Sequence, residues 1–105
     1  LTEIGGKSIV GSYFSNHYAR DSTDPLIRAF VERFKARFGR IPDAIAVLCY
    51  EAALVLFDAM KRAPTLSTQD IRDAIAATKD YRAVTGVITI NEKRDAVKSA
   101  VVLKV

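Results

Sequence analysis

The sequence contains few of the residues that build cross-linked, metal-bound or repetitive structures. Its 105 residues include one cysteine, one histidine, five glycines and three prolines. A single cysteine excludes a disulfide framework within the chain and a site with several thiolate ligands. A single histidine excludes the paired-histidine motifs of zinc enzymes, and the low glycine and proline content excludes a collagen-like chain. We therefore expect no metal and no cofactor.

Motifs for nucleotide binding and covalent catalysis are also missing. No G-x-G-x-x-G, G-x-x-x-x-G-K-[ST] or G-x-S-x-G pattern occurs. Cys49 lies within an apolar run, where burial disfavours the reactive thiolate. We expect Cys49 to be a small buried hydrophobe, and we predict that the chain is not an enzyme.

The residues that are present indicate a folded domain with a mixed surface. Hydrophobic residues make up 50% of the chain and charged residues 27%, which excludes a disordered tail. The net charge of +4 would suit nucleic acid. However, the 16 basic residues are spread from Lys7 to Lys104 among 12 acidic ones, and the densest basic stretch, 28–40, has helical spacing. We interpret that stretch as a solvated helix face and predict no nucleic-acid partner.

The first half of the chain predicts a strand followed by two helices. Residues 7–14 are rich in β-branched and aromatic residues and predict a strand. After a polar loop, Asp24 and Pro25 mark the start of an amphipathic helix that Gly39 ends. The next helix is predicted over 43–62. Its segment 44–57 contains one charged residue, so we expect this helix to be buried against further structure that these 105 residues do not supply. The apolar segment is too short to span a membrane.

The second half predicts a short helix and closing strands. Ser67 begins a capping pattern for the third helix. Residues 87–90 and 100–105 are strand candidates, expected to pair with each other as antiparallel neighbours across a polar turn. The predicted order β-α-α-α-β-β indicates a mixed α/β architecture.

Two places offer groups that could contact a ligand. Asn16, His17 and Tyr18 follow the first predicted strand, where open α/β sheets form crevices, although a solvated connection explains them too. Tyr50 and Glu51 place polar atoms in an otherwise apolar helix. They either have local partners in a core or face a cleft.

Five segments together carry a family resemblance. These are residues 11–18 (GSYFSNHY), 37–44 (RFGRIPDA), 49–53 (CYEAA), 71–75 (IRDAI) and 84–92 (VTGVITINE). In this combination the chain resembles the C-terminal part of leucine/isoleucine/valine-type substrate-binding proteins of ABC transporters, which have the type I periplasmic binding protein fold. The resemblance spans essentially the whole chain. Cys49 departs from the small residue usual at that position.

The resemblance implies a two-lobed protein that closes around its ligand by a hinge. Residues 1–18 would then belong to one lobe and the hinge, 24–80 to helices of the other lobe, and 84–105 to closing strands, with 1–105 forming the C-terminal segment of a partial fold. The ligand would be an amino acid or a related small carboxylate. Tyr50 is the first ligand-binding candidate, and Asn16, His17, Tyr18 and Glu51 are weaker ones.

The same resemblance sets expectations for partners and location. A membrane permease would be the partner, and the location would be periplasmic, or extracellular on a membrane-anchored lipoprotein. The alternative function is a ligand-sensing domain of a receptor or of an amide-responsive regulator with the same fold. In this family, the loops that bind the carboxylate and amino groups of the ligand belong to earlier parts of the protein that these 105 residues do not include. We therefore expect the 105 residues alone to bind amino acids weakly or not at all. We also expect them to self-associate or swap elements through the uncovered helix.

Overall fold

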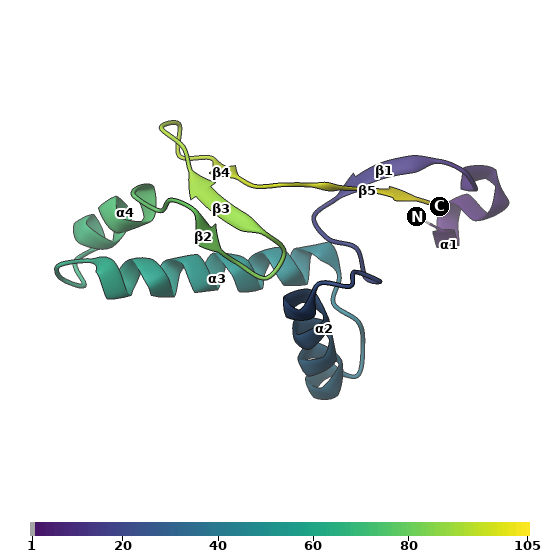
Figure 1. Cartoon of the computed structure of the whole chain (residues 1–105), viewed down its shortest axis with the longest axis horizontal. Helices are drawn as coiled ribbons and strands as arrows, with labels where there is room; N and C mark the ends of the chain where they lie inside the picture. The colour runs from purple at the N-terminus through teal and green to yellow at the C-terminus, as the bar shows by residue number, and fades with distance from the viewer. Residues whose placement is uncertain (1) are drawn as a thin grey trace.

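A computed structural model describes residues 2–105 and shows a helical body from which a two-stranded ribbon extends (Figure 1). The body contains three helices and a small three-stranded antiparallel sheet. In chain order the elements are α1 (Thr2–Gly5), the 3₁₀ turn η1 (Gly6–Ile9), β1 (Tyr13–Asn16), α2 (Pro25–Phe38), α3 (Ala44–Arg62), α4 (Thr68–Ala76), β2 (Tyr81–Arg82), β3 (Val87–Ile90), β4 (Ala96–Val97) and β5 (Val101–Lys104). The mixed α/β architecture predicted from the sequence is confirmed.

The ribbon is formed by two strands from opposite ends of the chain. β1 pairs antiparallel with β5, with Phe14 opposite Leu103. Two backbone hydrogen bonds extend the pairing, from Gly11 N to Val105 O (2.8 Å) and from Val105 N to Ser12 O (2.9 Å). The C-terminus therefore lies beside the start of the chain, at the end of the ribbon away from the body (Figure 1).

The three long helices begin where the sequence predicts, two of them at the capping patterns of Asp24 and Ser67. The side chains of Asp24, Asp43 and Ser67 each accept a hydrogen bond from a backbone N–H in the first turn, at 2.8, 2.8 and 3.1 Å. Each cap provides an acceptor for an N–H group that has no partner inside the helix. Gly39 ends α2 with φ 68°, a left-handed conformation that glycine adopts without the steric cost of a Cβ.

Two of the strand predictions are wrong. Residues 7–14 do not form one strand: η1 occupies Gly6–Ile9, and the strand starts only at Tyr13. Gly6 and Gly11 have positive φ angles, which bend this stretch away from extended backbone. The two closing strands also do not pair with each other. β3 pairs with β2 and β4, whereas β5 pairs with β1.

The hydrophobic core is small and divided. One cluster joins α2, α3 and the turn after β2, and a second lies between α3 and β3. The radius of gyration is 16.4 Å, against about 13 Å for a compact domain of this length. The molecule is therefore extended, with dimensions of 54 × 32 × 24 Å.

Helix α3 keeps an uncovered apolar face, as its sequence predicts. Ile45 and Phe57 are 71% and 55% exposed. Cys49 is exposed as well, so the prediction that it is a buried hydrophobe is wrong. Its position on α3 falls outside the stripe of Val47, Val55 and other buried residues that faces the rest of the chain.

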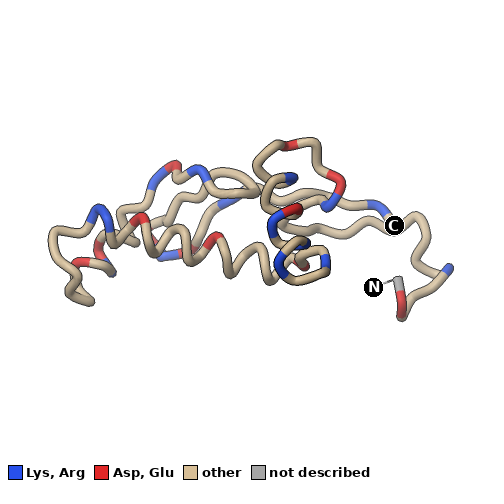
Figure 2. Tube along the Cα trace, turned by 90° about the horizontal axis from the view of Figure 1, so that it is seen from below, with Lys and Arg blue, Asp and Glu red and all other residues tan. Residues whose placement is uncertain are grey.

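Charged residues do not gather on one face. Basic and acidic positions are interspersed along the trace, on the helices and around the turns (Figure 2). Within residues 2–105, no helix combines the length and the apolar character needed to cross a membrane.

Candidate functional site

Two short crossing segments join the ribbon to the body, and four of the five candidate residues lie in or beside them. Residues 17–24 lead from β1 to α2, and residues 98–100 lead from β4 to β5. Figure 1 shows both segments crossing between the ribbon and the body. We call this region the junction.

Tyr18 fixes the first crossing segment to the body. Its side chain is 2% exposed and belongs to the core cluster with Ile27, Phe30 and Val47. Its hydroxyl donates a hydrogen bond to the carbonyl oxygen of Pro42, just before α3. Burial is the main cause that raises the pKa of this phenol above its usual value, so the hydroxyl keeps its proton and acts as a donor at neutral pH.

Asn16 and His17 form the turn that leads out of the ribbon. The Asn16 side chain accepts a hydrogen bond from His17 N at 2.9 Å and donates one to Tyr18 O at 3.3 Å. Both bonds are local and satisfy backbone groups at the end of β1. The His17 side chain is exposed.

A buried ion pair fixes the second crossing segment. Lys98 Nζ lies 2.5 Å from Glu51 Oε2 and donates to Thr85 Oγ1 at 2.7 Å. The other carboxylate oxygen of Glu51 accepts from Thr85 N and Thr85 Oγ1, at 2.7 and 2.8 Å. Glu51 is 1% exposed, and its carboxylate therefore has a charged partner and two further donors inside the body. A buried charge requires this kind of compensation.

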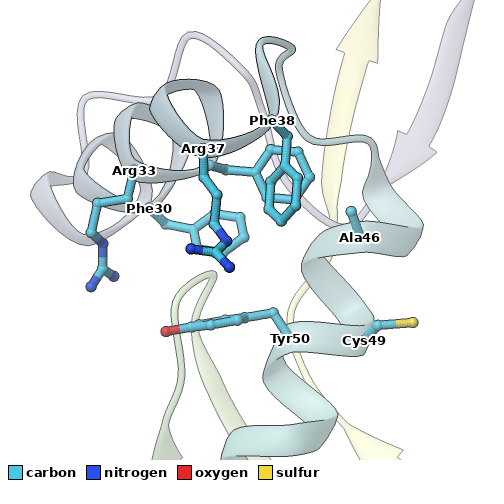
Figure 3. Close-up of a pocket in the computed structure, with 8 residues that line it drawn as sticks. Phe30, Arg33, Arg37, Phe38, Ala46, Cys49 and Tyr50 are labelled. Carbon is cyan, nitrogen blue, oxygen red and sulfur yellow. The ribbon is translucent and has the colours of Figure 1, made fainter.

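Tyr50 lies in a different place, at an apolar cavity of about 480 Å³ between α2 and α3. Its ring lies 4.8 Å from the Phe30 ring, measured between centroids. In Figure 3 the rings of Phe30, Phe38 and Tyr50 and the guanidinium of Arg37 gather around this space. The cavity can accept an apolar group, with cationic side chains at its rim.

The candidate residues are therefore not gathered into one site. Asn16 lines a second cavity of about 530 Å³ beside the ribbon, together with Phe14, Arg20 and Asp21. Tyr50 lines the first cavity, whereas Tyr18 and Glu51 are buried with partners of their own. Among residues 2–105, no group of three or more His, Cys, Asp or Glu side chains is placed to hold a metal ion.

Comparison with protein families gives a match to the whole chain. The model of the periplasmic binding protein family matches residues 1–105. The chain belongs to the periplasmic binding protein family. A comparison with curated proteins finds no match.

Solved structures of periplasmic binding proteins have the same fold. A leucine-binding protein, LivK, from Thermotoga maritima is 37% identical with a TM-score of 0.82, covering 99% of this chain and 30% of its own. A putative branched-chain amino acid ABC transporter protein from Rhodospirillum rubrum is 30% identical with a TM-score of 0.82, covering 99% and 31%. LivJ from Streptococcus pneumoniae, solved with isoleucine, is 26% identical with a TM-score of 0.78, covering 89% and 26%. The chain thus spans about a third or less of the length of these relatives, and it corresponds to part of the type I fold.

Sequence reasoning missed the groups that hold the junction of this periplasmic binding protein. It identified Glu51 and Tyr18 but not their partners Lys98, Thr85 and the Pro42 carbonyl. One signal for Lys98 was available, because a lone acidic residue in an apolar helix needs a cation nearby. Nothing in the sequence says which of the basic residues provides it.

Proposed function

We propose that this protein is the extracytoplasmic solute-binding component of an ABC importer, and that it captures an amino acid or a related small carboxylate between two hinged lobes. The observation that carries the proposal is the family match over the whole chain, together with 37% and 30% identity to proteins named for leucine and branched-chain amino acids. The second of these names, and that of LivJ from Streptococcus pneumoniae, describe transporter components, which favours transport over sensing.

The architecture supports a hinged mechanism. The ribbon and the body are connected through the two crossing segments at the junction, and a connection of this kind can absorb a rotation while the packed elements on either side stay rigid. A second lobe would be built on the ribbon. Because the chain spans about 30% of its relatives' length, we propose that ligand capture also needs the parts of the fold that this chain does not include.

The candidate residues take different roles in this proposal. Tyr50 and Asn16 are the contact candidates, because each lines a cavity, and exposed His17 would lie at the rim of the cleft. Tyr18 and Glu51 are buried and hydrogen-bonded, so we assign them to positioning the junction rather than to touching the ligand.

Isothermal titration calorimetry tests the proposal. The full-length natural protein is titrated with L-leucine, L-isoleucine and benzoate, which represent the ligand classes named for relatives. We expect saturable binding of at least one, and the absence of binding across a wide amino-acid and carboxylate panel would contradict the function. The 105-residue chain is the control. Micromolar binding by this chain alone would contradict the need for the rest of the fold.

A further inference from the structure

Glu51 and Lys98 form a buried ion pair that takes no part in the proposed ligand contacts. Lys98 and Glu51 have side chains that are 10% and 2% exposed, whereas the pair of Arg62 and Asp58 on the same helix is 38% and 32% exposed. Moving a carboxylate and an ammonium group out of water is costly, and a buried ion pair is weak evidence for stability alone. Stability alone therefore does not account for this buried pair, and the elements that it connects indicate its role.

The pair connects three parts of the molecule that are distant in sequence. Glu51 lies in the middle of α3, Thr85 lies in the turn between β2 and β3, and Lys98 is the first residue of the second crossing segment. Both carboxylate oxygens of Glu51 are used, one for Lys98 and one for Thr85, and Lys98 also contacts Thr85. This set of bonds leaves Lys98 little freedom relative to the body.

The residues between Lys98 and the ribbon are exposed and irregular. Ser99 and Ala100 are exposed and belong to no helix or strand, and β5 of the ribbon begins at Val101. On the first crossing segment, Tyr18 is fixed to Pro42 in the same way, one residue after exposed His17. In each crossing segment, one residue is thus fixed to the body, and its neighbours toward the ribbon are exposed.

We propose that Lys98, held by Glu51 and Thr85, is a positioning residue that fixes the second crossing segment to the body, so that the ribbon moves relative to the body at Ser99 and Ala100. This inference rests on the proposed hinged function. Confining the bend to two residues limits the orientations that the second lobe samples, and fewer unproductive orientations mean a higher apparent ligand affinity.

The test measures the spread of distances between ribbon and body in the full-length protein. Spin labels are placed at Lys7→Cys, near the far end of the ribbon, and at Arg72→Cys on α4, both exposed charged positions, with native cysteines replaced by serine. Distance distributions from pulsed electron resonance are compared for the wild type, Lys98→Met, Glu51→Gln and the double variant. Asp58→Asn is the matched control, because it removes an exposed ion pair from the same helix.

We expect Lys98→Met to broaden the distribution by about twofold or more, because a released segment samples more conformations. In the double variant no unpaired charge is left buried, and the amide oxygen of the introduced glutamine would still offer Thr85 an acceptor. The melting temperature should therefore recover toward the wild type, whereas the distribution stays broad. A purely structural pair would recover both properties together. Asp58→Asn should match the wild type in both.

An unchanged distribution in Lys98→Met and in the double variant would overturn the proposal, as would equal broadening by Asp58→Asn. If Lys98→Met alone does not fold, the double variant decides. These measurements are made without ligand, so they do not depend on the ligand class. Titration of the wild type with L-leucine, L-isoleucine and benzoate tests the proposed function separately, through a shift of the distance.

Discussion

Replacement of Tyr18 by phenylalanine removes one oxygen atom from the core and little else. The Tyr18 side chain is 2% exposed, and Pro42, whose carbonyl oxygen accepts the hydroxyl hydrogen bond, is also fully buried. Phenylalanine keeps the ring contacts with Ile27 and Val47 and leaves that carbonyl without its donor. An unsatisfied buried polar group costs about 1–3 kcal/mol. We therefore expect Tyr18→Phe to lower the free energy of unfolding by that amount.

Urea denaturation of the full-length protein at pH 7, followed by circular dichroism, measures this loss. Tyr13→Phe is the matched control, because Tyr13 is 67% exposed and its loss of a hydroxyl should change stability by less than about 0.5 kcal/mol. Equal stabilities for Tyr18→Phe and the wild type would refute the assignment of Tyr18 as the residue that fixes the first crossing segment.

The same substitution makes a pH prediction. Burial raises the pKa of Tyr18 above its usual value of 10.0, so the folded protein holds this proton more tightly than the unfolded chain. The stabilisation from the hydroxyl is complete below about pH 10 and is lost as the pH rises through the higher folded pKa. Across that range, unfolding experiments should show the stability difference between the wild type and Tyr18→Phe shrinking with increasing pH. A constant difference would contradict the raised pKa.

Three other predictions concern single positions. Gly39→Ala should destabilise the protein by about 1 kcal/mol, because φ 68° strains an L-residue while a Cβ there meets no atom within 4 Å; unchanged thermal unfolding would contradict this. Ser67→Ala should cost about 1 kcal/mol through loss of the cap on α4, with Ser8→Ala, an exposed serine outside any cap, as the control. Cys49 is exposed in the 105-residue chain and should react readily with a thiol reagent there. In the full-length protein the reaction should be slower, because we expect further structure to cover α3. Equal reaction rates would contradict this burial of α3.

Helix boundaries were predictable because their signals are local. Asp24, Asp43 and Ser67 are followed within three residues by the N–H groups that they cap, so a short stretch of sequence contains both partners. The uncovered face of α3 was predictable for the same reason, since the apolar run itself shows that no polar side exists.

Strand pairing and the junction were not predictable, because their partners are far apart in sequence. β1 and β5 meet from opposite ends of the chain, and residues 87–90 and 100–105, although neighbours in sequence, pair with other strands. Lys98 lies 47 positions from Glu51, and the sequence contains 16 basic residues that could have been its partner. The polar residues of an apolar helix could be recognised as special, but whether they face a ligand or a partner depends on tertiary packing.

Closure of two hinged lobes around the ligand is tested most directly by solution X-ray scattering of the full-length protein. The scattering is measured with and without a saturating amino acid that calorimetry shows to bind. Capture between hinged lobes predicts that the radius of gyration falls on ligand addition and saturates at the same concentration as the heat of binding. Binding with no change in the radius of gyration would contradict the claim that the protein closes around its ligand at the junction.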